Sequence, residues 1–251
     1  WLYAADRLYQ LPLGVVGIAV GIVLLPDLSR RLKAGDGTGA QNAYSRASEL
    51  SLALTLPAAV ALMVIPLPLV SVLFERGNFT GDDAAATALA VSIYGLGLPA
   101  FVLQKTLQPL FFAREDTKSP FHYALLAMVV NAALAFGLKP YIGWLAPAVA
   151  ATLAAWIMVI QLGLGARKFG EVTRLDNRFK QRIWRIIFTS AAMGVVLWIT
   201  NLALSPFFIA GGWRYLALTL LVVISVLAYF GLGQLFGAFR LAEFKSALRR
   251  G

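Results

Sequence analysis

The residues best suited to chemistry stand at the start of the first apolar stretch of the sequence. Asp6, Arg7 and Gln10 follow one another there, within about one turn of a helix. An arginine in the hydrocarbon of a membrane costs roughly 2.5–3.5 kcal/mol, so it normally faces a water-filled cavity or a protein partner. The planar guanidinium is suited to bidentate contact with phosphate. Arg7 therefore either binds an anionic group in a cavity or snorkels to the membrane surface and pairs with Asp6.

Two further polar side chains interrupt long apolar stretches. Lys105 has Gln104 and Gln108 as polar neighbours, and about 13 Å of helix separates it from Arg114 at the end of its stretch. It either snorkels toward that end or points into a cavity as a cation. Asn131 either bonds to a neighbouring helix or offers its carbonyl oxygen to a cation.

A polar turn separates the third apolar stretch from the fourth. Residues 114–120 read Arg-Glu-Asp-Thr-Lys-Ser-Pro, and a solvated turn that ends in a helix-starting proline explains their charges. Asp82 and Asp83 precede an alanine-rich run, where acids cap the first N–H groups of a helix and suit its dipole. We interpret both features as structural rather than catalytic.

The sequence has no set of residues typical of an enzyme. The absence of cysteine excludes disulfides and thiolate chemistry, and a single histidine, His122, excludes a histidine-cluster metal site. The carboxylates stand mostly in short gaps beside basic residues. Paired acids of a polar cleft and a glycine-rich phosphate loop are both missing. We therefore expect neither an enzyme nor a metal centre.

Seven long apolar stretches must position these side chains. The chain has 251 residues, of which 59% are hydrophobic and 14% charged, which is more apolar surface than a soluble domain of this size buries. Each stretch has roughly the 20 residues that a helix needs to cross a bilayer, and a helix satisfies its own backbone hydrogen bonds in lipid. We predict an all-α polytopic membrane protein with seven transmembrane helices. They cover residues 8–26, 50–74, 84–112, 120–138, 141–165, 184–210 and 213–239.

Basic residues collect in every second gap between these stretches and in the C-terminal tail. The positive-inside bias places those segments in the cytoplasm, with residues 1–7 near the outer face and the C-terminus inside. The net charge of +10 then suits cytoplasmic loops and anionic lipid headgroups rather than nucleic acid.

The fifth gap is the longest and the most charged, and it predicts a boundary in the chain. We expect residues 1–166 to form one lobe, residues 167–182 a basic cytoplasmic linker, and residues 183–251 a two-helix hairpin. The hairpin is rich in Leu, Val and Ile throughout, which suits a lipid-facing surface or an apolar groove.

Glycine and proline recur in the first three stretches. They are Pro12 and Pro26, then Pro57, Pro66 and Pro68, then Gly95, Gly97, Pro99 and Pro109. Such residues bend transmembrane helices, and their repetition over three consecutive stretches favours a transporter with moving helices. Because the chain begins with Trp1 rather than Met and has an odd number of stretches, we expect a piece of a larger bundle.

Three strings resemble the MurJ (MviN) family of lipid II flippases, in the order and spacing of that family. The first, ADRLYQLPLGVVGIAVGIVLLPDLSR at 5–30, resembles its eighth transmembrane helix. The second, LFERGNFT at 73–80, resembles the loop before its tenth helix. The third, QKTLQPLFFAREDTKSP at 104–120, resembles the end of that helix and the next cytoplasmic turn. The resemblance implies helices 8–14 of a fourteen-helix protein of the MOP exporter superfamily, without its N-terminal half.

The resemblance also implies a function and a site. The family moves the undecaprenyl-diphosphate-linked peptidoglycan precursor, lipid II, across the bacterial inner membrane by alternating access around a cationic cavity. By resemblance, Arg7 is a cavity arginine with Asp6 and Gln10 beside it, and Lys105 is a further cation of the substrate site. The last two helices of the family line a hydrophobic groove suited to a polyprenyl tail. The alternative is a related exporter of the superfamily, for O-antigen-type lipid-linked oligosaccharides or drugs.

Two more sets of residues rest on the resemblance. The cytoplasmic turn of the family, a candidate gate, matches Arg114, Asp116 and Lys118. Asn131 and Thr152 match a region where some relatives bind sodium, although Ala135 stands where a carboxylate is expected. Coupling to Na⁺ or to the membrane potential is thus an expectation, with no other cofactor. The implied partners are lipid II, membrane lipids and the missing N-terminal half.

Overall fold

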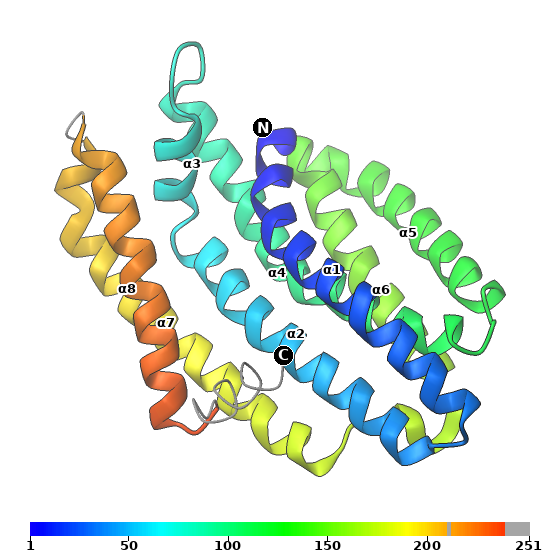
Figure 1. Ribbon diagram of the computed structural model, residues 1–251. Coiled ribbons are helices and arrows are strands. Elements are labelled where there is room, and N and C mark those ends of the chain that lie inside the picture. Colours follow the sequence, from blue (N-terminus) through cyan, green and yellow to red (C-terminus); the bar gives the residue numbers. More distant parts are fainter. Residues whose placement is uncertain (210–211, 239–251) are drawn as a thin grey trace.

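The computed structural model describes residues 1–209 and 212–238, and all regular elements in these ranges are helices (Figure 1). The long helices are α1 (Leu2–Lys33), α2 (Gly37–Val64), α4 (Gly81–Phe112), α5 (Lys118–Ile142), α6 (Ala146–Ala166), α7 (Asn177–Ile209) and α8 (Trp213–Leu235). The shorter ones are α3 (Pro66–Phe74) and the 3-10 helices η1 (Gly143–Leu145) and η2 (Arg167–Thr173). The predicted all-α fold is confirmed.

The long helices account for the seven predicted membrane crossings. Six segments of the described residues are long and apolar enough to span a bilayer, and one of them, Lys118–Thr173, contains both α5 and α6. Gly143 lies between these two helices with a φ of 57°, a conformation that glycine adopts readily because it has no Cβ. The chain reverses there, and α5 and α6 pack side by side (Figure 1). The protein is therefore a multi-pass membrane protein.

Only the second crossing is interrupted within the described residues. Ile65 leaves helical geometry, with φ −124° and ψ 41°, and Pro66 then begins α3. Proline lacks an N–H and its ring clashes with the preceding turn, so the hydrogen-bond ladder ends there. By contrast, α1 and α4 each continue as one helix through two prolines. The glycines and prolines of the first and third stretches therefore do not end their helices.

Helix α4 is the centre of the bundle, with α1, α2 and α6 packed around it. A Cβ added to Gly97 would lie 2.9 Å from Thr152 Oγ1, and one added to Gly95 would lie 3.2 Å from the Ala59 carbonyl oxygen. Small residues let transmembrane helices approach closely, and such packing drives their association in lipid. These two glycines, predicted from the sequence as sites of bending, allow close helix packing in the structure.

The gaps between the helices gather at two opposite ends of the bundle. At one end, Lys168 Nζ lies 2.8 Å from an Asp116 carboxylate oxygen and joins the fifth gap to the third. At the other end, the Trp1 indole N–H donates to Asp83 at 2.6 Å, and the Trp1 ring centre lies 4.8 Å from that of Trp144. The basic gaps therefore share one end, as the charge pattern predicts. The predicted cytoplasmic C-terminus falls in 239–251, outside the described residues.

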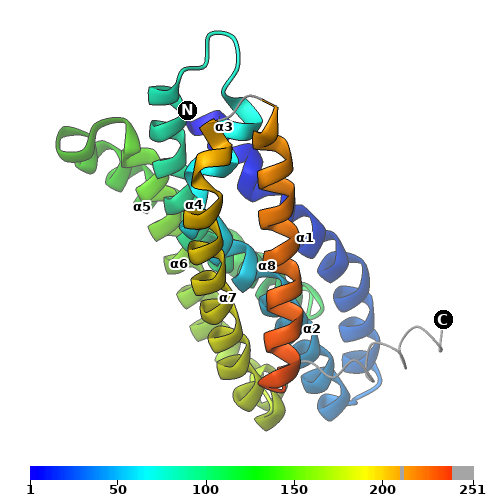
Figure 2. The same cartoon turned by 90° about the vertical axis from the view of Figure 1, so that its left-hand side faces the viewer.

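Helices α7 and α8 form a hairpin on one side of the bundle, against α2, while α5 lies on the opposite side (Figures 1 and 2). Most contacts of the hairpin with the other helices pass through α2, and fewer join α8 to α3. A Cβ on Gly194 of α7 would lie 2.6 Å from Val60 Cγ1 of α2, so the two helices are in close contact. The predicted linker, 167–182, contains η2 and the first residues of α7.

Replacing Tyr229 by Phe should weaken the attachment of this hairpin. The buried Tyr229 hydroxyl donates to the Ala53 carbonyl of α2 at 2.6 Å. Loss of one such hydrogen bond should lower the free energy of unfolding by about 1 kcal/mol, measured as a lower thermal unfolding temperature in detergent. Tyr215→Phe, at a residue that is 50% exposed, is the matched control and should melt like wild type. Identical melting of both variants would contradict the role of Tyr229.

Candidate functional site

The N-terminal end of α1 presents Tyr3, Arg7 and Gln10 along one exposed stripe, because residues three or four apart share a helix face. Arg7 Nη2 donates to the Tyr3 hydroxyl at 2.5 Å, and the guanidinium carbon lies 4.7 Å from the centre of the Tyr3 ring. Gln10 donates to the Asp6 carboxylate. The sequence left open a pair between Arg7 and Asp6, and the structure instead joins Arg7 to Tyr3 by a hydrogen bond.

The other side of α1 packs on α4. The Tyr9 ring centre lies 5.3 Å from that of Phe101 and 4.8 Å from that of Tyr94. Arg7 and Tyr9 are two residues apart, so their side chains point about 200° apart around the helix. Arg7 therefore points away from α4 into open space. A guanidinium carries five N–H donors, more than the hydrogen bond to Tyr3 uses.

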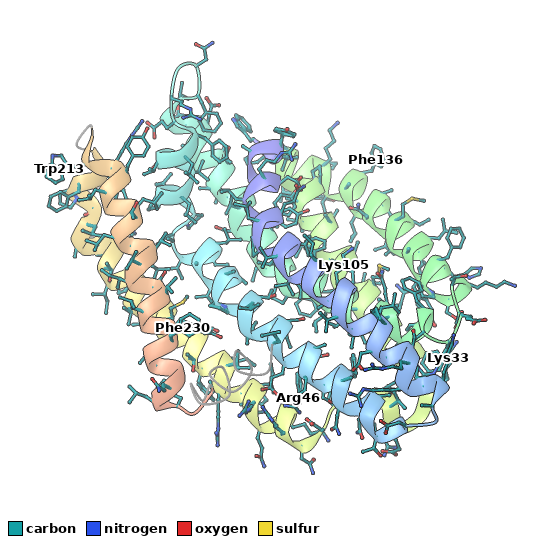
Figure 3. The ribbon with its side chains drawn as sticks, viewed as in Figure 1. Lys33, Arg46, Lys105, Phe136, Trp213 and Phe230 are labelled. Carbon is teal, nitrogen blue, oxygen red and sulfur yellow. The ribbon has the colours of Figure 1, made fainter. Side chains whose placement is uncertain are left out.

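Lys105 is exposed one helical turn beyond Phe101 on α4. Since α1 and α4 begin at the same end and Tyr9 stacks on Phe101, Lys105 lies deeper in the bundle than Tyr9 and therefore deeper than Arg7. Figure 3 shows Lys105 near the middle of α1. The predicted substrate-binding residues thus fall into two places.

Asp116 is the centre of the turn between α4 and α5. Its carboxylate accepts hydrogen bonds from Lys168 Nζ at 2.8 Å, from the Ser119 N–H at 3.0 Å and from the Ser119 hydroxyl at 2.8 Å. These donors, the Lys168 ammonium first among them, stabilise the charged form and lower the pKa of Asp116 to about 2. The turn is thereby tied to η2.

Arg114 and Lys118 flank this carboxylate in different ways. The Arg114 guanidinium lies 4.3 Å from the centre of the Phe169 ring and donates to the Leu110 carbonyl at 2.8 Å. Lys118 is exposed at the first residue of α5. Of the three predicted gate residues, the structure brings Arg114 and Asp116 against η2 and leaves Lys118 facing outward.

Replacing Asp116 by Asn should remove a pH-dependent part of the stability. Because the folded-state pKa is lowered to about 2, this contribution is complete above the unfolded value of about 3.9 and is lost as the pH falls through about 2. The unfolding temperature of the wild type should therefore fall between about pH 4 and pH 2 more steeply than that of the variant. Asp82→Asn, at an exposed acid, is the control. Equal slopes for wild type and Asp116→Asn would contradict this role.

The two residues predicted to bind a cation, Asn131 and Thr152, lie on different helices. Thr152 is buried on α6, and its hydroxyl donates to the Ile93 carbonyl of α4 at 3.1 Å. Asn131 is half-buried on α5. In the described part of the chain, no group of three or more His, Cys, Asp or Glu side chains is placed to hold a metal ion. Two neutral oxygens, with Ala135 in place of a carboxylate, are a weak donor set for a hard cation.

An ion cluster that sequence analysis missed joins α2 to the start of α7. The Glu49 cluster comprises Arg46, Glu49, Asp176, Arg178 and Arg182. The Glu49 carboxylate lies 2.8 Å from Arg182 and 3.8 Å from Arg178, and it also pairs with Arg46, which pairs in turn with Asp176. Figure 3 shows Arg46 where α2 approaches α7. The sequence signal was weak, an acid directly before an apolar stretch with Arg46 three residues earlier, since Arg178 and Arg182 are more than 100 residues away.

These observations first define a class: a multi-pass helical membrane protein with exposed cations, Arg7 and Lys105, on spanning helices, as is typical of transporters. The family model described as Lipid II flippase MurJ matches residues 1–235. The chain belongs to the MurJ family of lipid II flippases, and the resemblance seen in the sequence is confirmed.

Similar proteins support this assignment. A probable lipid II flippase MurJ of Rhizobium tropici is 40% identical over 252 residues, which cover 99% of this chain and 47% of that protein. The probable lipid II flippase MurJ of Vibrio cholerae is 33% identical over 98% of this chain and 47% of its own length. A solved structure of lipid II flippase MurJ in an inward closed conformation matches with a TM-score of 0.76 and 25% identity, over 94% of this chain and 46% of that one. The chain spans about half the length of these relatives.

Proposed function

We propose that this chain acts as one half of a flippase that moves lipid II across the bacterial inner membrane. Membership of the family over residues 1–235 supports this proposal, as do the names of relatives about twice as long. In this proposal, a further half such as those relatives have provides the second wall of a cavity between two lobes. In this arrangement the basic end of the bundle and the C-terminus face the cytoplasm.

The observation that carries the proposal is the exposed Arg7 on a membrane-spanning helix. A guanidinium that faced lipid there would be destabilising, whereas one that faces an aqueous cavity keeps its hydration. Tyr3 holds the guanidinium on the exposed side of α1 and leaves further N–H donors directed outward. These donors suit bidentate contact with the diphosphate of lipid II. Asp6 and Gln10, joined by a hydrogen bond, form the polar wall beside the Arg7 guanidinium.

Lys105 contributes a second positive charge to the path of the substrate and is not a direct partner of Arg7. It stands deeper in the bundle than Arg7, one helical turn beyond Phe101 on α4. A cation lowers the energy of an anion most strongly where the surrounding has a low dielectric constant. A diphosphate that leaves Arg7 therefore meets further positive charge.

The apolar part of the substrate needs a path of its own. The α7–α8 hairpin offers large exposed apolar side chains along its length, including Trp198 at 55%, Leu202 at 54% and Leu227 at 66% exposure. A polyprenyl tail suits such a surface, because it buries hydrocarbon without a polar cost.

The turn of Arg114, Asp116 and Lys118 acts as the cytoplasmic gate. The ion pair between Asp116 and Lys168 opens and closes there during alternating access.

Transport of labelled substrates into proteoliposomes tests the proposal. The intact protein that carries this chain is reconstituted and offered fluorescent lipid II or an O-antigen-type lipid-linked oligosaccharide in parallel. We expect protein-dependent movement of lipid II and none of the oligosaccharide. Movement of the oligosaccharide alone would favour a related exporter of the same fold, and movement of neither would overturn the proposal.

A further inference from the structure

A groove of about 440 Å³ lies between α1 and α2, at the basic end of the bundle. Its walls are apolar, with Val16, Val20 and Leu24 from α1 and Leu50 and Leu54 from α2. Arg31, Arg46 and the carboxylate of Asp27 line its end. Arg31 is 24 residues beyond Arg7 on α1, or about 36 Å along the helix. The groove is therefore separate from the end of α1 that carries Arg7.

The floor of the groove is buried and its rim is open. Val20 and Leu24 are 4% and 3% exposed, whereas Val23 and Leu50 at the rim are 67% and 50% exposed. Ser51, which also lines the groove, is 1% exposed, and its hydroxyl has no hydrogen-bond partner among the described residues. A buried polar group without a partner is destabilising, and an oxygen atom of a ligand in the groove would remove that cost.

The basic end of the groove keeps donors for an anion. Arg31 pairs with Asp27 at 2.9 Å and with Asp36 at 3.3 Å. Arg46 pairs with Glu49 and Asp176. Each guanidinium has five N–H donors, so two ion pairs leave some of them for a further oxygen atom. Asn42 adds an amide N–H₂ to the same lining.

We propose that this groove binds an anionic phospholipid, with its phosphate at Arg31, Arg46 and Asn42 and an acyl chain along the apolar walls. Basic pockets between transmembrane helices on the cytoplasmic side are typical sites for anionic headgroups, and the charge pattern places this end in the cytoplasm. The volume is in the range of small-molecule sites, which are mostly apolar with a few placed polar groups.

Native mass spectrometry of the intact protein tests the site without lipid II. The protein is purified in detergent and titrated separately with phosphatidylglycerol and with phosphatidylcholine. We expect phosphatidylglycerol to bind at least about tenfold more tightly, because two arginines face its phosphate. Arg31→Gln together with Arg46→Gln should reduce this preference to about twofold or less. Lys139→Gln together with Lys180→Gln removes the same charge from exposed positions elsewhere and should keep the preference.

A second variant leaves the ion pairs untouched and blocks the apolar walls. Leu50→Trp fills the groove and should abolish the tight phosphatidylglycerol adduct, whereas Leu89→Trp, at a residue of α4 that is 55% exposed, should not. The proposal is overturned if wild type has no preference for the anionic lipid, or if neither groove variant changes it. It is also overturned if Leu50→Trp weakens binding of undecaprenyl diphosphate alone, which would assign the groove to the substrate tail. The readout contains no transport step, so failure here leaves the proposed flippase function untouched.

Discussion

Replacing Arg7 by Ala in the intact protein should abolish growth complementation and lower lipid II transport by about 30- to 150-fold. That range corresponds to about 2–3 kcal/mol, the lower part of what truncating one member of a charged hydrogen-bonded pair costs. The physical reason is the loss of the exposed guanidinium that Tyr3 holds on the open face of α1. The amount of protein in the membrane should stay the same, because Arg7 is exposed and packs against no buried residue of the core.

Two conservative variants separate charge from geometry. Arg7→Lys keeps the charge but loses the planar fork, so we expect partial recovery of transport. Tyr3→Phe keeps the charge and the planar fork of Arg7 and removes only the hydrogen bond at 2.5 Å between the two residues. Transport should therefore fall by a few-fold at most. Normal growth of Arg7→Ala at wild-type expression would refute the assignment of Arg7 to a diphosphate site.

Replacing Glu49 by Ala should lower the free energy of unfolding by about 2–3 kcal/mol. Removal of one member of a buried ion pair typically costs 3–5 kcal/mol, and we reduce that figure because the cluster is partly hydrated. The Glu49 side chain is 12% exposed and that of Arg182 is 13% exposed, whereas that of Arg46 is 32% exposed. Without Glu49, the arginines that join α2 to α7 repel one another. The variant should show a lower unfolding temperature and faster proteolysis at the start of α7.

Glu171→Ala is the matched control for this prediction. Glu171 also pairs with an arginine, Arg174, but both side chains are 72% exposed. Exposed pairs contribute little, because water and salt screen them and the side chains lose entropy on pairing. Equal unfolding temperatures of Glu49→Ala and Glu171→Ala would show that the Glu49 cluster does not hold the hairpin.

The spans of this protein were predictable because crossing a membrane depends on local sequence. Length and hydropathy alone marked the segments that became α1 to α8. The helix start predicted beside Asp82 and Asp83 is present, and Thr80 forms a capping box there with Asp83. Proline was less informative. Pro66 separates α2 from α3, whereas Pro99 lies within a continuous α4. Neighbouring helices decide that outcome, and one sequence does not reveal which helices those are.

By itself, the amino-acid sequence determined the number of crossings, the common end of the basic gaps and the position of Arg7 near the start of α1, since each depends on additive, short-range properties. Only the tertiary structure decided which charges meet. It joined Glu49 to Arg182 across 133 residues and Asp116 to Lys168 across 52 residues. It also opened a groove between α1 and α2 with basic residues at one end. These features arise from the packing of one helix on another, and the helix pairs are chosen by shape and small residues far apart in the chain.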